Sequence, residues 1–344
     1  MPSAADELRR AIAGAGGALR FDRYLDVALY GEHGFYSVTG RAGRRGDFLT
    51  SPEVGPLFGT VIARALDEWW VELGCPAPFR VVEIGAGPGT LARSVLASGA
   101  RCIDTLRWIA VERSPAQRGL HPSAIESRID LPTDPVHVVI GNEVLDNVPF
   151  RLLVNDGGWK ESHVAVAGER FVEVLRPFTG TRHLPTDAPH GARIPLQDEA
   201  VELIRACRRM VSVGHMLFFD YCTPTTDNVA RMPWREWLRT YRQHDRGGHY
   251  LDAPGEQDIT CQVVLDQVIG GVDGAGVTTQ AAFLGRWGVD ALVDEGRRAW
   301  EAAASRPSVA ALRMRSRVRE SEALLDPHGL GGFTVMHWSF PTRA

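Results

Sequence analysis

The sequence predicts an α/β fold with a seven-stranded, mostly parallel sheet, and three observations support this class. Residues 79–84 form an apolar run rich in β-branched side chains, which is typical of a buried parallel strand. Three alternate glycines follow this run, and apolar residues at helical spacing come next, so the segment begins a strand–turn–helix crossover. Comparable apolar runs at 106–111 and 135–140 give neighbouring parallel strands.

The glycine turn after the first strand indicates a ligand that carries positive charge. A dinucleotide fingerprint, Gly-x-Gly-x-x-Gly, would place its third glycine at the position of Thr90. Glu83 puts a carboxylate at the end of the strand, where it would repel a diphosphate and attract a cation. S-adenosyl-L-methionine (SAM) carries an ammonium, a sulfonium and two ribose hydroxyls but no phosphate; the alternative is a turn with a structural role only. We predict that the turn binds SAM through Glu83, Gly85, Ala86, Gly87, Gly89 and Thr90.

A second acid ends the next predicted strand, at 106–111. Glu112 follows the glycine turn by about 20 residues, where an acid in such folds accepts hydrogen bonds from ribose hydroxyls. We predict this role for Glu112, although an acid at a strand end can also be an ordinary surface charge. Ser114 and Pro115 then begin another helix.

Polar residues follow the fourth predicted strand, at 135–140. In an open α/β sheet, ligands lie beyond the carboxyl ends of the strands at the point where the strand order reverses. Asn142, Glu143 and Asp146 therefore fall beside the predicted donor. The alternative is that Asn142 caps a helix whose dipole the acids complement.

The N-terminal part contains a loop rich in glycine, aromatic and acidic residues, at 31–53. Loops of this length inside compact domains are usually functional, and the alternative is a surface loop held by its aromatic side chains. We predict that its acids Asp47 and Glu53 face the acceptor together with Asn142, Glu143 and Asp146.

Composition and charge exclude several classes of protein. The 344 residues carry a net charge of -4 without a long basic run, which disfavours nucleic acid as the main ligand. The sequence has no apolar run of membrane-spanning length and no secretory signal at residues 1–10. The five cysteines lack metal-ligand spacing and a disulfide pattern, so we expect reduced thiols, a cytoplasmic protein and no metal.

The remaining chain adds segments to this core. Residues 223–257 interleave tryptophan and tyrosine with five arginines, and we predict a substrate lid over the strand ends. Such a pattern could also bind single-stranded nucleic acid, although the acidic chain disfavours this alternative. The expected organisation is a helical and loop extension at 1–75, a catalytic domain at 76–344, a hairpin at 151–177, helices at 259–269, 284–305 and 309–325, and strands at 277–283 and 333–340.

Several blocks of the sequence resemble the MidA-like methyltransferases, a family that includes a mitochondrial complex I assembly arginine methyltransferase. The resemblance spans nearly the whole chain, and its most specific block is Gly-Asp-Phe-Leu-Thr-Ser-Pro-Glu at 46–53. Other matching blocks lie at 26–36, 83–92, 111–115, 141–149, 254–260 and 279–284. The predicted cofactor-binding residues in these blocks also include Thr50, Pro52, Arg113, Ser114 and Asn142.

The resemblance implies a Rossmann-like class I methyltransferase fold, SAM as the methyl donor and, in the mitochondrial member, a protein arginine as the acceptor. The chain departs from the family pattern at Ala124–Ile125, where Trp-His is usual, and at 333–336, where Phe-Lys-Val-Leu is common. The Trp- and Arg-rich segment at 223–257 is also unusual. These departures leave the acceptor open.

The sequence therefore predicts methyl transfer from SAM to a nitrogen or oxygen of a protein or of a small molecule. Paired carboxylates would suit a guanidinium, whereas a hydroxyl acceptor would need a base. One alternative is a tailoring methyltransferase of a small metabolite, and another is a SAM-binding assembly factor without turnover. A dehydrogenase fits Glu83 and Thr90 least well. A homodimer is left open.

Overall fold

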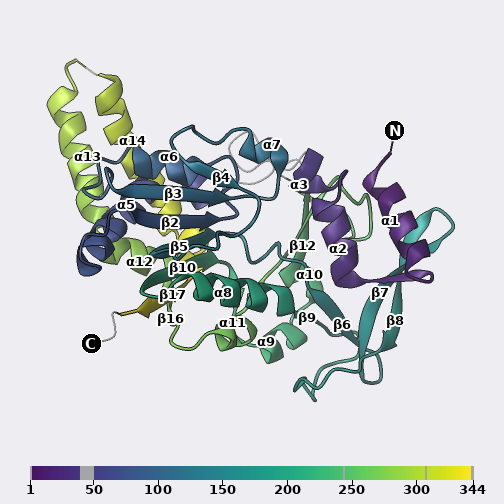
Figure 1. Cartoon of the computed structure of the whole chain (residues 1–344). Helices are drawn as coiled ribbons and strands as arrows, with labels where there is room; N and C mark the ends of the chain where they lie inside the picture. The colour runs from purple at the N-terminus through teal and green to yellow at the C-terminus, as the bar shows by residue number, and fades with distance from the viewer. Residues whose placement is uncertain (1, 39–49, 243–244, 307, 342–344) are drawn as a thin grey trace.

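The computed structural model describes residues 2–38, 50–242, 245–306 and 308–341, and a seven-stranded sheet lies at its centre (Figure 1). The strands, in spatial order, are β16 (Gly276–Thr279), β17 (Thr334–Phe340), β10 (Gly214–Asp220), β5 (Val138–Asn142), β2 (Phe79–Ile84), β3 (Leu106–Val111) and β4 (Glu126–Arg128). β17 runs antiparallel to both of its neighbours, and the other pairs are parallel. The predicted mostly parallel, seven-stranded sheet is confirmed.

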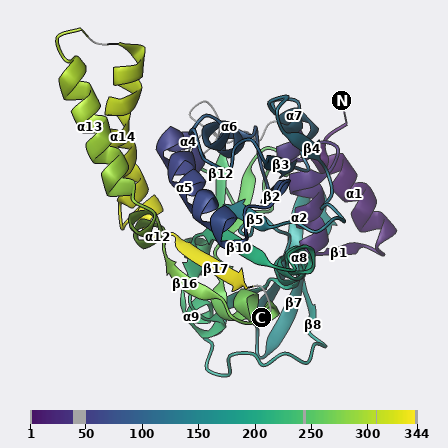
Figure 2. The same ribbon diagram turned by 60° about the vertical axis from the view of Figure 1, so that its left-hand side comes forward.

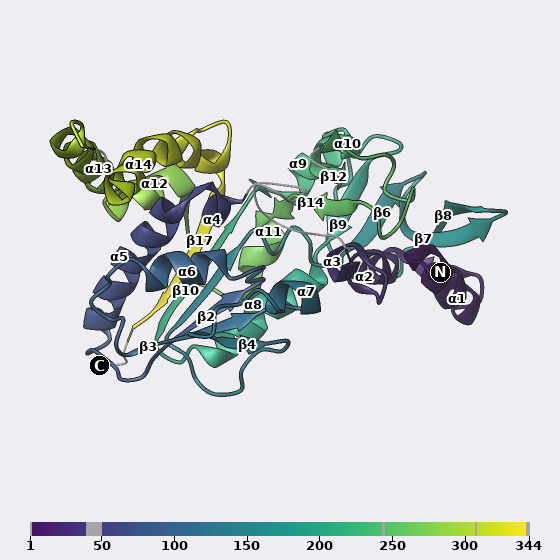
Figure 3. The same ribbon diagram turned by 90° about the horizontal axis from the view of Figure 1, so that it is seen from above.

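Alternate residues of the strands pack into two separate cores, as the two-residue period of a strand requires. Val81 and Phe219 face the core that α5 and α6 cover, whereas Val82 and Phe218 face the core that α8 covers. Both faces of the sheet are therefore covered by helices (Figures 1 and 3). The helices on the first face are α5 (Pro56–Glu72), α6 (Thr90–Leu96), α12 (Gln280–Arg286) and α14 (Val309–Leu325), and those on the second are α8 (Asp198–Met210) and α11 (Leu265–Val268).

A second sheet and the N-terminal helices form a third core beside the large sheet (Figure 1). Its strands are β1 (Ala18–Arg20), β7 (Trp159–Ala167), β6 (Arg151–Asn155) and β9 (Arg193–Leu196), with β8 (Arg170–Pro177) paired to β7. The helices are α1 (Ala4–Gly14), α2 (Phe21–Tyr30), α3 (Phe35–Val38), α9 (Thr226–Arg231) and α10 (Trp234–Trp237). β1 pairs with β7, so the N-terminal segment and the predicted hairpin share one sheet.

The segment at 223–257 contributes to this third core. Trp237 and Tyr250 are fully buried there, and Trp234 packs against it. Its strands β12 (Leu238–Arg242) and β13 (Asp245–Arg246) form a small sheet with β14 (Asp258–Cys261). That the segment acts as a lid stays a prediction.

The helices α13 (Val289–Ala303) and α14 form a hairpin that projects from the body of the protein (Figure 2). Seen from above, this hairpin and the β7–β8 hairpin lie at opposite ends of the protein (Figure 3). No helix in the described part of the chain is long and apolar enough to span a membrane. The remaining short elements are α4 (Ser51–Val54), α7 (Pro115–Arg118), η1 (Ile269–Gly271), η2 (Leu330–Gly332), β11 (Cys222–Thr223) and β15 (Val263–Val264).

Three secondary-structure predictions were wrong in the C-terminal third. The expected helix at 259–269 is instead β14, β15, α11 and η1, because β14 pairs with the sequence-distant β12. The expected strand at 277–283 ends at Thr279, whose hydroxyl caps α12 by accepting a hydrogen bond from the Ala282 amide. The expected helix at 284–305 is split into α12 and α13 at Gly288, which has a left-handed φ of 79°.

Candidate functional site

The glycine turn lies at the carboxyl end of β2, between the strand and α6. Gly85, Gly87 and Gly89 have φ values of 66°, 52° and 77°, a left-handed conformation that side chains disfavour. A Cβ atom on Gly85 would lie 2.7 Å from Cγ2 of Val144, whereas one on Gly87 would meet no atom within 4 Å. Backbone conformation therefore requires glycine at all three positions, and close packing adds a second reason at Gly85.

A cavity of about 440 Å³ opens beside this turn. Most of the predicted site residues line it: Thr50, Pro52, Glu53, Glu83, Gly85, Ala86, Gly87, Thr90, Glu112, Arg113, Asn142 and Glu143. Three others, Gly89, Ser114 and Asp146, lie behind the surface of the cavity. Asp47 lies outside the described residues.

Two acids from adjacent strands line the cavity on the side of the glycine turn. Glu83 is buried at the end of β2 and accepts a hydrogen bond from Trp108 Nε1 at 2.9 Å. Glu112, which follows β3, accepts one from the Gly87 amide at 2.9 Å and one from the Ser114 amide at 2.7 Å. Burial raises the pKa of Glu83 to about 8 and also raises the pKa of Glu112. Within the described residues neither acid forms an ion pair, although Arg93 and Arg118 partly offset the rise in the pKa of Glu83 and of Glu112, respectively. A positively charged ligand would further offset their desolvation.

A third acid, Glu143, follows β5 on the facing side of the cavity. Its Oε1 atom accepts hydrogen bonds from the Ser51 amide at 3.2 Å and from Asn142 Nδ2 at 3.0 Å. Burial, followed by repulsion from Asp146, raises the pKa of Glu143 to about 8. Asn142 lines the cavity, and its Oδ1 atom is buried and has no hydrogen-bond partner among the described residues.

Asp146 does not face the cavity, contrary to the prediction. Its Oδ2 atom accepts a hydrogen bond from the Thr260 hydroxyl at 2.6 Å and another from the Tyr221 hydroxyl. Tyr221, which directly follows β10, and Thr260 of β14 thus hold the Asp146 side chain. The alternative of a helix capped by Asn142 is also wrong, because residues 143–150 form turns and irregular structure.

The N-terminal loop reaches the cavity through α4. Thr50 directly precedes this helix, and Thr50, Pro52 and Glu53 line the cavity. The Thr90 hydroxyl at the start of α6 donates a hydrogen bond to Glu53 Oε1. The loop and the glycine turn are therefore in direct contact.

Two aromatic residues missed by the sequence analysis form another part of the lining. The rings of Tyr30 and Tyr36 stack with their centroids 5.5 Å apart, and the guanidinium of Arg113 lies 4.1 Å from the centroid of Tyr30. Arg113 also forms an ion pair with Asp26 at 3.1 Å. The density of aromatic residues at 31–36 was a signal for Tyr36, whereas nothing in the sequence indicated other lining residues: Gln117, Asp130, Asn147 and Glu199.

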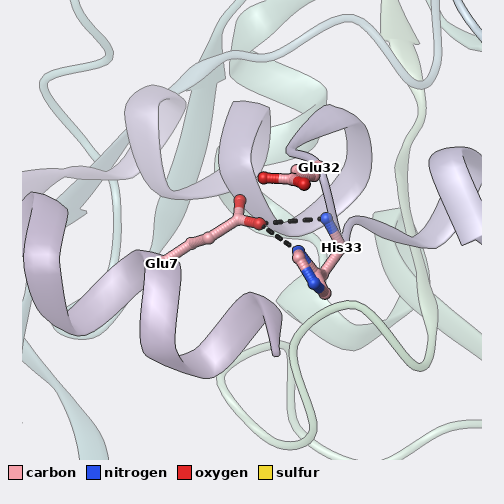
Figure 4. Close-up of side chains that lie close together, drawn as sticks. All are labelled: Glu7, Glu32 and His33. Carbon is pink, nitrogen blue, oxygen red and sulfur yellow. Dashed lines mark hydrogen bonds and ion pairs between the residues drawn. The ribbon is translucent and has the colours of Figure 1, made fainter. Parts of the chain in front are cut away.

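A separate polar cluster lies outside the cavity, where α1 meets the turn after α2 (Figure 4). Glu7 Oε1 accepts hydrogen bonds from the His33 amide at 3.0 Å and from His33 Nδ1 at 2.6 Å, and Glu32 is exposed beside them. Three such side chains could hold a cation. Because the hydrogen bonds between Glu7 and His33 already join α1 to this turn, we assign the cluster a structural role.

Comparison with known proteins agrees with this geometry. A family described as "Putative S-adenosyl-L-methionine-dependent methyltransferase" matches residues 61–282. The protein arginine methyltransferase NDUFAF7 of Xenopus laevis mitochondria is 38% identical over 309 residues, covering 75% of this chain and 68% of that protein. A crystal structure of a superfamily member from Burkholderia thailandensis with bound S-adenosyl-homocysteine has a TM-score of 0.80 at 30% identity, covering 98% of this chain and 91% of the other.

The chain belongs to the MidA-like family of SAM-dependent methyltransferases. Its fold is the Rossmann-like class I fold, and SAM is its cofactor. The matches do not cover the whole of every relative. The NDUFAF7 homologue of Drosophila melanogaster is 39% identical over 94 residues, which span 22% of that protein and 27% of this chain.

The residues of this MidA-like cavity fit SAM. Glu83, Glu112 and Glu143 would offset the ammonium and sulfonium charges and accept hydrogen bonds from hydroxyls. Asn142 Oδ1 is a buried acceptor that no donor of the described residues satisfies. Gly87 leaves open space where any side chain would project.

Proposed function

We propose that this MidA-like protein transfers the methyl group of SAM to a cationic nitrogen, with a protein arginine as the first candidate acceptor. The observation that carries the proposal is the charge of the cavity. Six carboxylate side chains and one basic side chain line it within the described part of the chain. The acids are Glu53, Glu83, Glu112, Asp130, Glu143 and Glu199, and the basic residue is Arg113. A cationic donor or acceptor would stabilise the ionised form of these acids, including Glu83 and Glu143, whose pKa is raised to about 8 in the free protein.

The donor side would be formed by the glycine turn and the first two acids. When bound, SAM supplies an electrophilic methyl group on a sulfonium. Glu83 and the backbone of the turn would hold the methionine end, and Glu112 would hold the ribose hydroxyls. Asn142 Oδ1 would accept a hydrogen bond from a ligand N–H.

The acceptor side would be formed by Glu143 with Glu53. Two carboxylates can bind a guanidinium through paired hydrogen bonds and so fix the direction of one nitrogen. Methyl transfer to that nitrogen leaves it with a proton to lose. The Glu143 carboxylate could accept this proton, since a general base works best with a pKa near the working pH. The further role predicted for Asp47 stays a prediction.

The name of the Xenopus relative as a protein arginine methyltransferase supports this acceptor. A tailoring enzyme of small metabolites would be favoured by a large apolar pocket under Trp234 and Trp237. Trp237 is instead buried in the third core, and Trp234 lines a cavity of about 170 Å³ together with arginines. These positions favour a protein acceptor. We also propose the cytoplasm as the location and leave homodimer formation to a measurement of mass in solution.

Calorimetric titration with SAM tests the donor side. We expect micromolar binding to the native protein and a loss of at least about tenfold in affinity for Glu112→Ala, because the carboxylate accepts hydrogen bonds from ribose. The control Glu126→Ala removes an exposed acid of β4 outside the cavity and should bind normally. A folded protein that binds no SAM would refute the proposal.

Transfer of labelled methyl groups tests the acceptor side. An arginine-containing peptide should become labelled, and the same peptide with lysine in place of arginine should not. Labelling of small amines or hydroxyl compounds alone would favour a metabolite enzyme. SAM binding without transfer to any acceptor would favour an assembly factor without turnover.

A further inference from the structure

The loop after β5 places Glu143 in an unusual backbone conformation. Its φ is 50°, in the left-handed region that residues other than glycine rarely adopt. Such conformations cost free energy and persist only where the surroundings hold them. The Glu143 amide donates a hydrogen bond to the Phe219 carbonyl at 2.8 Å, which fixes the start of the loop to β10.

A buried acid at the end of β10 holds the rest of this loop. Asp220 is fully buried, and its Oδ2 atom accepts hydrogen bonds from the Leu145 amide at 3.0 Å and the Asp146 amide at 3.4 Å. Its Oδ1 atom accepts a third from the Tyr221 amide at 3.0 Å. One carboxylate therefore joins the strand end to two successive amides, those of Leu145 and Asp146, which follow Glu143 by two and three residues.

From this geometry we infer that Asp220 is a positioning residue, whose carboxylate locks residues 143–146 in the turn that presents Glu143 to the acceptor. The inference rests on the role proposed for Glu143. Three N–H donors suit an ionised carboxylate. These backbone donors lower the pKa of Asp220 in part, whereas burial and the nearby Asp146 and Glu143 raise it well above its usual range.

The network also explains the position of Asp146. Its amide is bound by Asp220, while its carboxyl group is bound by Tyr221 and Thr260. The loop therefore turns Asp146 away from the cavity and leaves Glu143 on the cavity side. Asp220 acts on the reaction through the backbone rather than by contact with the acceptor.

The variant Asp220→Asn tests this inference. The side-chain amide of asparagine has only one oxygen that can accept hydrogen bonds. Its NH2 group must therefore face at least one of the backbone N–H donors, and that hydrogen bond is lost. We expect the amides in peptides covering 142–149 to exchange hydrogen for deuterium at least about tenfold faster. We also expect kcat to fall at least about tenfold while the Kd for SAM changes less than about twofold, because a displaced Glu143 affects the transfer step.

The matched control is Asp266→Asn, which changes a carboxylate that accepts a hydrogen bond from the Thr226 amide at 2.9 Å, outside the cavity. This control should leave hydrogen exchange at 142–149, kcat and the Kd for SAM unchanged. Native exchange at 142–149 in Asp220→Asn would overturn the inference, and so would equal losses in kcat and SAM affinity. If Asp220→Asn does not fold, Asp220→Glu provides the same exchange test. Exchange needs no acceptor, so failure of the proposed function and failure of this inference remain distinguishable.

Discussion

The two sides of the cavity are built in different ways. The donor wall, which we define as Glu83, Gly85, Gly87 and Glu112, comes from two adjacent strands and the turn between β2 and α6. The acceptor wall, which we define as Tyr30, Tyr36, Glu53, Glu143 and Asn147, comes from α2, α3, α4 and the loop after β5. The first wall is set by local backbone geometry, and the second is assembled from distant parts of the chain.

Distant carboxylates hold the acceptor wall together. Asp258 at the start of β14 accepts hydrogen bonds from the Tyr36 hydroxyl at 3.0 Å and from Asn147 Nδ2 at 3.1 Å. The Tyr30 hydroxyl donates to the Asn147 carbonyl at 3.0 Å. Changes to the donor wall should therefore alter SAM affinity, whereas changes to the acceptor wall should alter the transfer step.

The largest expected effect comes from a substitution of Glu143, which should impair the transfer step but not SAM binding. Glu143→Gln keeps the shape of the side chain but removes the carboxylate that would bind the acceptor and take its proton. We expect kcat to fall at least about 100-fold, the usual size of a lost general base, while the Kd for SAM changes less than about threefold. Methyl-transfer kinetics and calorimetry measure the two effects.

The comparison variant is Glu199→Gln, which removes another acid of the same cavity. It should retain most of the activity if the position of Glu143, rather than the total charge, matters. Equal losses in the two variants would contradict a specific role for Glu143.

A smaller effect is expected where the walls meet, at Gly85 and Val144. Gly85→Ala forces alanine into a left-handed conformation, at a cost of about 1–2 kcal/mol, and pushes its Cβ against Val144. We expect the Kd for SAM to rise about tenfold, or about 1.4 kcal/mol, because the contact with Val144 shifts the turn that binds the donor. The double variant Gly85→Ala/Val144→Ala should recover part of the affinity.

The control for backbone strain is Gly99→Ala, at φ 75° with no atom near the new Cβ. It should lower thermal stability without changing SAM affinity. If Val144→Ala recovers none of the affinity that Gly85→Ala loses, the walls are not coupled at this contact.

The difference between the walls also explains what could be predicted from the sequence. Glu83, the glycines and Glu112 follow from the period of one strand and the spacing of one turn, so their positions were predictable. Tyr30 and Asn147 are joined by a hydrogen bond between residues 117 positions apart, and Asn147 also binds the distant Asp258, which no local pattern indicates. Asp146 was misplaced because the direction of its side chain depends on Tyr221 and Thr260, which are distant in sequence.

The last expected effect is a pH dependence of the donor wall. Burial raises the pKa of Glu83 to about 8, so the free site holds a proton below that pH. A bound ammonium favours the ionised acid and lowers this pKa, so SAM binding releases a proton. The affinity for SAM should therefore rise between pH 6 and 7.5, by at most about tenfold per pH unit for one proton. The α-amino group of a ligand titrates near pH 8, so the test stays below this value.

The raised pKa of Glu83 has the opposite effect on the stability of the free protein, which falls as the pH rises. The folded state keeps a proton that the unfolded chain loses above its usual glutamate pKa of about 4.5, so the free energy of unfolding falls as the pH rises toward 8.

Calorimetry in two buffers with different ionisation enthalpies measures the proton that is released when SAM binds. Glu83→Gln should abolish most of the release, although weaker binding will require higher protein concentrations. A Kd that is constant from pH 6 to 7.5, with the same heat in both buffers, would place the ammonium away from both Glu83 and Glu143, because the pKa of each acid is raised to about 8 in the free protein.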